Sequence, residues 1–403
     1  MPPQSQDRLA PEFRYLCAAV RASLPAAAPP VPPQPETAID WPAVVRGAAR
    51  HRATGLVLAG LQTAALPAPP AAEMGKLRRN ASALARVCLA NAAETLRLAG
   101  MLQAAGIRVM VLKGVVLSQQ LHGDPARRDA GDIDLLVDPA RFWDAEAVLL
   151  QAGYEPDGPL IPGSHRAAGQ ALLRDLSYRN RARGTLVELH QRLTANPHRL
   201  DCSFEALWRA HGEVRLAGRA VATLPDRILP LYLCVHGAHH CWERLCWLAD
   251  LAALLDSPDA VRRTLDDAEA AGLGRSMRLA VGLCNRLLGL PLPEEALPAG
   301  PWARRVDRFI HSVFGGTAWL EEPAKGTAAW VRRELRQRLH VYALKPGWRH
   351  RWNELQADLR NPADWGVIPL PARLIWLYPA LRPIGWVVRT LRRRRSLTGR
   401  PRR

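Results

Sequence analysis

Two aspartates stand two residues apart at the head of an apolar run in the middle of the chain. Asp132 and Asp134 begin a segment that continues to Val137. Alternate side chains of a β-strand point to the same face, so both carboxylates would share one face while Ile133 and Leu135 enter a core. Neighbouring carboxylates repel each other, and a divalent cation between them relieves that repulsion. Mg²⁺ suits such a site because it takes one or two carboxylates and leaves its other positions to water and substrate phosphates.

A third carboxylate, Glu188, has the same kind of setting. It lies in a second apolar segment, residues 185–189, and His190 shares its face. If this segment is a strand beside the first, the three carboxylates converge and could hold two metal ions about 3.5–4 Å apart. Such an arrangement suits in-line phosphoryl transfer. His190 could also serve as a general base for an acceptor hydroxyl, although this chemistry often leaves that task to a carboxylate.

The segments around these residues alternate between strand and helix patterns. Strands are predicted at 108–112, 132–137, 173–178 and 185–189. Helices are predicted after Gly114 and from Asp138 to Ala152, with Asp138-Pro139 as a strong helix start. The last two strands are joined by a short turn that ends in Gly184, which is typical of a hairpin. This order predicts an α/β core with a mixed sheet.

Lys113 and Gly114 stand where the first predicted strand passes into a helix. A helix N-terminus suits an anion, and glycine lets the backbone approach it closely. Lys113 also fits a structural position at the edge of the core. Arg128 lies four residues before Asp132 on a predicted loop. A guanidinium there could grip phosphate oxygens with two hydrogen bonds, and an ordinary surface arginine fits the pattern as well.

Three histidines interrupt a long apolar stretch at residues 229–255. His236, His239 and His240 have the spacing of one helical face, and Trp247 follows on the same predicted helix. A zinc site would lack a fourth ligand at a characteristic spacing. From the residues alone, a buried hydrogen-bond network is the remaining interpretation.

Several of these motifs together resemble the nucleotidyltransferase superfamily, which has the fold of DNA polymerase beta. They are Lys113-Gly114, Arg128, Asp132-x-Asp134 and Glu188-x-His190. They are more similar to a bacterial branch of largely uncharacterised members, often found with gene clusters for polysaccharide or peptide products. The superfamily usually has Gly-Gly or Gly-Ser in its phosphate loop, and this branch shares the Lys-Gly form. The resemblance covers roughly residues 35 to 380, with its specific motifs in 113–190 and 236–250.

The resemblance implies roles for eight residues. The catalytic and metal-binding carboxylates are Asp132, Asp134 and Glu188. The nucleotide-binding residues are Lys113, Gly114, Arg128, His236 and His240. The resemblance also implies two Mg²⁺ ions and a nucleoside triphosphate (NTP), such as ATP, as substrate. The reaction would move a nucleoside monophosphate from the NTP to a hydroxyl or phosphate acceptor, in polysaccharide or peptide-product biosynthesis. The sequence does not define the acceptor.

Two alternative functions stay open. The Lys-Gly pair in the phosphate loop favours a catalytically degenerate protein that binds nucleotide or acts as a scaffold. The excess of 55 basic over 37 acidic residues gives a formal charge of +18, which favours anionic partners such as nucleic acid. That charge suggests a toxin-like nucleotidyltransferase that modifies tRNA, and frequent arginine codons in a GC-rich genome would explain it equally well.

The expected fold class is α+β and mostly helical, with a small mixed-sheet nucleotidyltransferase core flanked by helical regions. The chain has 403 residues, of which 48% are hydrophobic, so it can fold as two or three globular units. We predict four parts: an N-terminal helical region with a Pro/Ala-rich linker, the core, a helical domain, and a Trp/Pro/Arg-rich extension with a basic tail. Their ranges are 1–95, 96–215, 216–325 and 326–403.

The cysteines and apolar runs indicate the compartment. Seven cysteines without a C-x-x-C motif favour reduced thiols in a cytoplasm. The N-terminus lacks the pattern of a signal peptide, and no apolar run reaches the roughly 18 residues of a membrane span. We therefore expect a cytoplasmic protein. The run Arg392-Arg393-Arg394-Arg395 is usually a solvated tail, and it is also compatible with contact with an anionic membrane surface.

Overall fold

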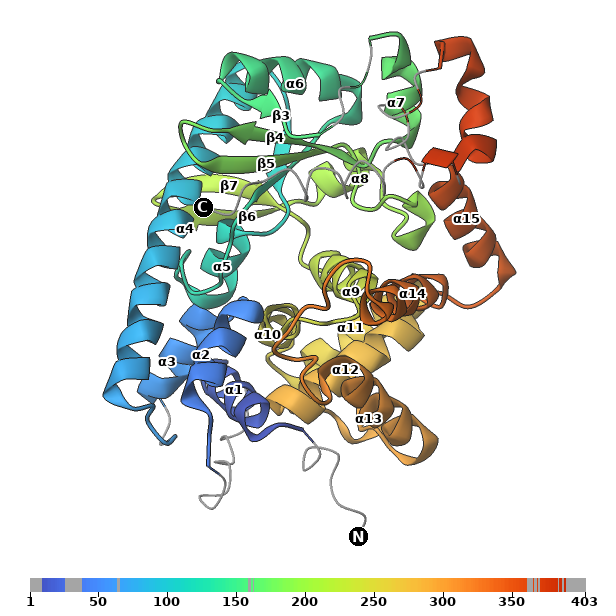
Figure 1. Ribbon diagram of the computed structural model, residues 1–403. Helices are drawn as coiled ribbons and strands as arrows, with labels where there is room; N and C mark the ends of the chain where they lie inside the picture. The colour runs from blue at the N-terminus through green and yellow to red at the C-terminus, as the bar shows by residue number, and fades with distance from the viewer. Residues whose placement is uncertain are drawn as a thin grey trace.

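The computed structural model describes residues 9–25, 38–63, 66–158, 161, 163–360, 365, 368, 370–382, 384–385 and 388. Its strands form one mixed sheet, and most of its helices gather in a separate layer beside that sheet (Figure 1). This confirms the predicted α+β, mostly helical fold class. The predicted basic tail at Arg392-Arg393-Arg394-Arg395 lies outside the described residues.

The elements follow one another in a mixed order. The N-terminal helices are α1 (Pro11–Ala22), α2 (Trp41–Arg50), α3 (Thr54–Thr63) and α4 (Ala71–Ala104). The strands are β1 (Val109–Val111), β2 (Ile133–Val137), β3 (Glu155–Pro156), β4 (Asp175–Asn180), β5 (Thr185–His190), β6 (Gly212–Leu216) and β7 (Arg219–Thr223). The helices among them are α5 (Val115–His122), α6 (Phe142–Gln151), α7 (Arg166–Leu172) and α8 (Phe204–Arg209). The C-terminal helices are α9 (Leu229–His239), α10 (Leu245–Leu254), α11 (Pro258–Ala270), α12 (Gly274–Leu288), α13 (Gly300–Phe314), α14 (Ala328–Tyr342) and α15 (Trp348–Leu359).

The sheet has the strand order β3-β4-β5-β2-β1-β7-β6. β2 lies in its middle, antiparallel to β1 and parallel to β5. The predicted hairpin is confirmed as β4 and β5, which pair antiparallel along their whole length. β3, β6 and β7 were not predicted, and β7 pairs with β1 in parallel. The prediction of a mixed sheet was therefore correct, but it left out the strands at both edges of that sheet.

The two faces of the sheet pack against different layers. Val111, Ile133 and Leu135 belong to a core that includes residues of α4 and α6. Met110 and Leu136, from the same strands, belong to a larger core that includes α1, α2, α3 and the C-terminal helices. Asp134 alternates with Ile133 and Leu135, so its side chain shares the face of Leu136. The carboxylates therefore point from the sheet toward the helical layer.

α4 is the longest helix, with 34 residues, and it confirms the helix predicted at 73–105. It ends at Ala104 with Ala105 as its C-cap, and the next residue, Gly106, adopts the positive φ of 69° that favours glycine after a helix. α4 contacts α2 and α3 at one end and β1, β7 and α6 at the other, so it spans both layers (Figure 1). The predicted boundaries after residues 95 and 215 fall inside α4 and β6, and the division into domains stays a prediction.

The single helix predicted over 229–255 is wrong, because the chain turns between α9 and α10. Cys241 and Trp242 adopt positive φ angles of 51° and 52° there. A Cβ atom on Gly237 would lie only 2.4 Å from the Trp242 ring, so a larger residue at this position would clash with the indole. The backbone N–H of Trp242 also donates to the Gly237 carbonyl oxygen at 2.8 Å. The glycine thus makes room for a buried indole that folds the chain back.

Two further observations concern the expected compartment. All seven cysteines are free. None of the helices that the structure describes combines the length and the apolar character needed to cross a bilayer.

Candidate active site

The parallel pairing of β2 and β5 brings the predicted carboxylates together. Asp134 lies directly opposite Glu188 in the register of these strands. Asp132 stands one residue before β2, at the same end. Asp134 is fully buried, whereas the side chains of Asp132 and Glu188 are about a quarter exposed. The site is therefore open to solvent on the side of Asp132 and Glu188 and closed behind Asp134.

Lys113 joins the two aspartates. Its Nζ atom lies 2.7 Å from Asp134 Oδ2 and 3.6 Å from Asp132 Oδ2. Burial works against the charged ammonium, but the attraction of Asp134 and Asp132 is stronger and raises the pKa of Lys113. The same ammonium, with help from His190, lowers the pKa of Asp134 despite the burial of that carboxyl. The lysine thus supplies the positive charge that keeps a buried carboxylate ionised.

His190 joins the second pair of carboxylates. Its Nε2 atom lies 3.2 Å from Asp134 Oδ1 and 3.4 Å from Glu188 Oε2. Burial alone would lower the pKa of this imidazole, but its bonds to Asp134 and Glu188 raise the pKa to about 9. An imidazole that holds its proton at neutral pH is a poor general base. The geometry makes His190 a residue that positions the carboxylates.

The donor set fits a divalent cation. Ligand atoms of Asp134, Glu188 and His190 lie within 4.8 Å of one another. The buried Oδ2 atom of Asp134 accepts no hydrogen bond of normal geometry, and the Lys113 ammonium is the cation nearest to it. Carboxylate oxygens are the ligands that Mg²⁺ prefers. Asp132, Asp134 and Glu188 could therefore hold such an ion if the Lys113 ammonium shifted toward a phosphate.

Gly114 forms the start of α5 and has a φ of 75°. A Cβ atom at this position would lie 3.2 Å from the Asp132 carbonyl oxygen, so a side chain would be both strained and crowded. The glycine thereby lets the N-terminus of α5 lie against the loop that carries Asp132. The predicted approach of Gly114 to a nucleotide phosphate stays a prediction.

Arg128 makes a buried ion pair. Its Nε atom lies 2.9 and 2.7 Å from the two carboxylate oxygens of Asp250 on α10, and both residues are buried. Its backbone N–H donates to Ser118 Oγ on α5 at 3.0 Å. Arg128 thus ties the loop before β2 to the helical layer. Its predicted contact with phosphate stays a prediction, since the guanidinium is engaged with Asp250.

His236 and His240 lie beside Trp247 rather than on one continuous helix with it. The ring centroids of His236 and His240 are 5.1 Å apart, and those of His240 and Trp247 are 5.0 Å apart and stacked. Burial and the positive charge of Lys113 lower the pKa of both imidazoles, that of His240 to about 4. The two histidines are therefore neutral, and they can form hydrogen bonds without competing with Lys113 for the aspartates.

Three residues near the carboxylates were missed from the sequence. Tyr232 is buried one helical turn before His236, and burial raises its pKa, with a smaller opposing effect of Lys113 and a smaller raising effect of Asp134. Asp175 lies opposite His190 in the register of β4 and β5, and it is ion-paired with Arg174. The i, i+4 spacing of Tyr232 and His236 was a usable signal. The position of Arg174 and Asp175 depends on the register of the hairpin, which the sequence did not fix.

A mixed sheet that presents three carboxylates beside a lysine and a helix N-terminus is suited to phosphoryl transfer. The family described as uncharacterised nucleotidyltransferase matches residues 37–289 of the chain. The chain belongs to this family. The match includes the whole sheet and α9–α12. It ends well before residue 380, the approximate end of the resemblance expected from the sequence. A search of curated proteins found no match.

Proposed function

We propose that the protein is a Mg²⁺-dependent nucleotidyltransferase that moves a nucleoside monophosphate from an NTP to a hydroxyl or phosphate acceptor. Two contacts support this proposal: the Lys113 ammonium lies within 3.6 Å of a carboxylate oxygen of both Asp132 and Asp134, and Asp134 lies directly opposite Glu188 across β2 and β5. Membership of the nucleotidyltransferase family supports the reaction class. The acceptor oxygen would attack the α-phosphorus of the NTP, and pyrophosphate would leave. An ion held by the three carboxylates would offset the charge on the transferred phosphate.

Each residue near this point has a separate task in the proposal. Asp132 and Asp134 would bind two ions, and Glu188 would orient the one next to the attacking acceptor. Lys113 would leave the aspartates and pair with the triphosphate, which also meets the N-terminus of α5 at Gly114. His236 and His240, which are neutral, would contact the base or the acceptor by hydrogen bonds. His190 would hold Asp134 and Glu188 in register.

The test uses NTPs labelled at the α-phosphate, Mg²⁺ and a cell extract as the source of acceptor. We expect wild-type protein to transfer label. The variants Asp132→Asn and Glu188→Gln should each transfer it at least 100-fold more slowly. Asp144→Asn is the matched control, because Asp144 is an exposed aspartate on α6 and its ion-pair partner among the described residues is Arg141. Equal labelling by wild type and both site variants would remove these carboxylates from the reaction.

A metal-independent nucleotide-binding protein is the second candidate. The observation that favours it is the Lys113 ammonium, a built-in cation between the two aspartates. Calorimetry with a non-hydrolysable ATP analogue, with and without Mg²⁺, separates the two candidates. Binding that does not respond to Mg²⁺, with no transfer of label to any fraction of the extract, would favour this second function.

A further inference from the structure

The C-terminal part of the chain exposes large apolar side chains to solvent. It lies beyond residue 289, where the family match ends, and it contains α14 and α15. Among the residues that the structure describes, eight of the twelve exposed large apolar side chains belong to it. We call these eight the C-terminal apolar patch: Val331, Leu335, Leu339, Trp348, Trp352, Leu355, Trp376 and Ile384. Single exposed apolar residues are common, but such a concentration marks an interaction site.

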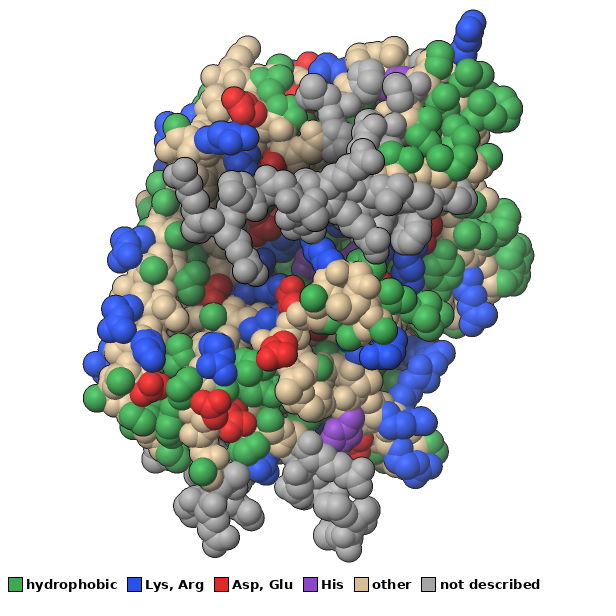
Figure 2. Space-filling model, viewed as in Figure 1, with side chains coloured by type: hydrophobic (Ala, Val, Ile, Leu, Met, Phe, Trp, Pro, Cys, Tyr) green, Lys and Arg blue, Asp and Glu red, His purple; other side chains and the backbone are tan. Residues whose placement is uncertain are grey.

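The residues of the patch are ordered along the two helices. Three of them recur every four residues on α14, and three more follow at intervals of four and three on α15. Each set therefore lies on one side of its helix. The helices pack together, and Arg338 on α14 pairs with Asp358 on α15 at 3.0 Å. Figure 2 shows apolar side chains gathered over α15 and over the segment that follows it.

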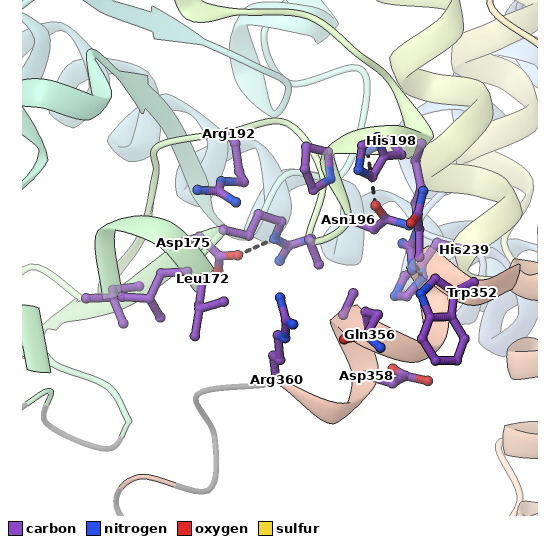
Figure 3. A pocket seen from close by; sticks show the side chains of 18 of the residues that line it. Leu172, Asp175, Arg192, Asn196, His198, His239, Trp352, Gln356, Asp358 and Arg360 are labelled. Atoms are coloured by element: carbon purple, nitrogen blue, oxygen red, sulfur yellow. Dashed lines mark hydrogen bonds and ion pairs between the residues drawn. The ribbon is translucent and has the colours of Figure 1, made fainter. Parts of the chain in front are cut away.

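α15 is fixed to the core by its inner side. Gln356 lines a cavity of about 800 Å³ together with Asn196 and His239 (Figure 3). The buried Glu354 carboxylate accepts hydrogen bonds from Arg199 at 2.7 and 2.6 Å. The C-terminal extension thus returns to the loop after β5. Its outer apolar residues are exposed on a helix that is held in place.

The segment after α15 separates its aromatic residues in the same way. Tyr378 is buried, its hydroxyl donates to the Ile368 carbonyl oxygen at 2.7 Å, and its ring centroid lies 6.1 Å from that of Trp365. Trp376, two residues before Tyr378, is 72% exposed. An exposed indole gains free energy when an apolar partner covers it.

The charge around the patch is positive. The exposed charged residues that the structure describes between 326 and 385 are all arginines: Arg332, Arg338, Arg349, Arg351, Arg360 and Arg373. The two partly exposed acidic residues of this stretch, Glu334 and Asp358, are each ion-paired with an arginine. The partner that complements this surface is therefore anionic and also offers apolar contact.

We propose that the C-terminal apolar patch binds the surface of an anionic lipid bilayer. Indole rings lie at the boundary between headgroups and acyl chains, and aliphatic side chains enter the apolar region below it. The surrounding arginines attract the negatively charged headgroups. A contact of this kind stays at the surface and needs no helix that spans the bilayer. The inference does not depend on the proposed reaction.

Two other partners fit this surface less well. A second copy of the chain would bring two arginine-rich patches together, and their charges would repel each other. A nucleic acid would stack its bases on the indoles. It would leave the aliphatic side chains of Leu335, Leu339 and Ile384 without an apolar partner.

The test measures sedimentation of the full-length protein with vesicles of phosphatidylglycerol and phosphatidylcholine in equal parts, and with vesicles of phosphatidylcholine alone. We expect wild type to bind the anionic vesicles at least tenfold more tightly than the neutral ones. Trp348→Ser/Trp376→Ser should weaken binding to the anionic vesicles at least tenfold. Leu89→Ser/Leu150→Ser is the matched control and should bind as wild type does, because both leucines are exposed on other helices, α4 and α6.

A second pair of variants tests the charge and keeps the apolar residues. Arg349→Gln/Arg351→Gln should weaken binding to the anionic vesicles at low salt, and the loss should shrink at high salt, where headgroup charge is screened. Arg78→Gln/Arg79→Gln is its control, since both arginines are exposed on α4. Circular dichroism checks that every variant is folded.

Three results would overturn the proposal. Wild type that sediments with neither kind of vesicle, or a tryptophan variant that binds as tightly as wild type, removes membrane contact from this patch. Binding of total tRNA that the tryptophan variant loses, without binding of vesicles, would assign the patch to nucleic acid. A dimer that the tryptophan variant converts to a monomer in sedimentation velocity would assign it to a second copy of the chain.

Discussion

Asp134 on β2 lies directly opposite Glu188 on β5, and the two strands run parallel. Cross-strand partners have side chains on the same face, so this register sets both carboxylates at one point of the sheet. A shift of one residue in either strand would turn one of the carboxylates into the opposite core. The relation between these two residues is therefore the structural basis of the candidate site.

We expect the two aspartates to differ in their effect on stability. Asp134→Ala removes the closest partner of the buried Lys113 ammonium and should lower the free energy of unfolding by about 3–5 kcal/mol. Asp132→Ala removes a partly exposed and more distant partner and should cost less than about 1 kcal/mol. Urea unfolding in the presence of a chelator measures both. Equal losses would mean that Lys113 does not depend chiefly on Asp134.

The buried pair of Arg128 and Asp250 predicts strong coupling between the sheet and the helical layer. Arg128→Met or Asp250→Asn alone should destabilise the protein by about 3–5 kcal/mol, because each leaves a buried charge without its partner. The double variant should lose much less than the sum of the two. A double-mutant cycle from urea unfolding gives the interaction energy. Additive losses would show that the pair contributes no coupling.

His51 predicts a pH dependence of stability. It is fully buried, its Nδ1 atom accepts from the Leu245 N–H at 3.3 Å, and burial is the main cause that lowers its pKa from 6.5 to about 3. Below pH 6.5 the unfolded chain binds this proton and the folded chain does not. Stability should therefore fall by about 1.4 kcal/mol per pH unit from pH 6.5 toward 3 on account of this residue.

His51→Gln keeps a hydrogen-bond acceptor and should flatten that part of the pH profile. His198→Gln, at an exposed histidine, is the matched control and should leave the profile as in wild type. Thermal unfolding between pH 7 and 5 measures the slope. An unchanged slope in His51→Gln would show that this imidazole does not titrate as its burial indicates.

Glu354 predicts that α15 can be released from the core without disturbing the sheet. Glu354→Gln weakens the paired hydrogen bonds from Arg199, so amide exchange in Trp348–Leu359 should become at least tenfold faster. Exchange in β2 and β5 should stay as in wild type. Hydrogen–deuterium exchange with mass spectrometry measures both regions. Equal acceleration in the sheet would mean that Glu354 supports the whole fold.

The central part of the fold was predictable because strong local signals agree there. Asp138-Pro139 starts a helix, Gly106 follows the end of another, and the apolar residues after Asp132 form a strand with Asp134 on one face. Their chemistry also indicated the convergence of the carboxylates. The contact of Asp134 with Glu188 then needed only that β2 and β5 be neighbours.

The elements that the sequence did not predict have weaker local signals or depend on contacts between distant residues. β6 and β7 contain few apolar residues, and Glu213, Arg215 and Arg219 alternate with them at an exposed edge of the sheet. The turn between α9 and α10 lies in a continuous apolar run, and its cause is the packing of Trp242 against Gly237. The glycine was visible in the sequence, but the position of the indole was not.

The pairing of Arg128 with Asp250 and the return of α15 to the sheet could not be predicted for the same reason. Both join residues more than 100 positions apart, and nothing in their local sequence specifies the partner. Such contacts depend on how the sheet and the helical layer pack, which periodicity does not encode.

The most direct test of the three-carboxylate site is Mn²⁺ binding followed by electron paramagnetic resonance, with a non-hydrolysable ATP analogue present. Mn²⁺ prefers the same oxygen ligands as Mg²⁺ and reports its own binding. Wild-type protein should bind Mn²⁺, and Asp132→Asn/Glu188→Gln should weaken that binding at least 100-fold while the chain remains folded. Mn²⁺ binding of equal strength in the two proteins would contradict the proposal that these carboxylates form the metal site.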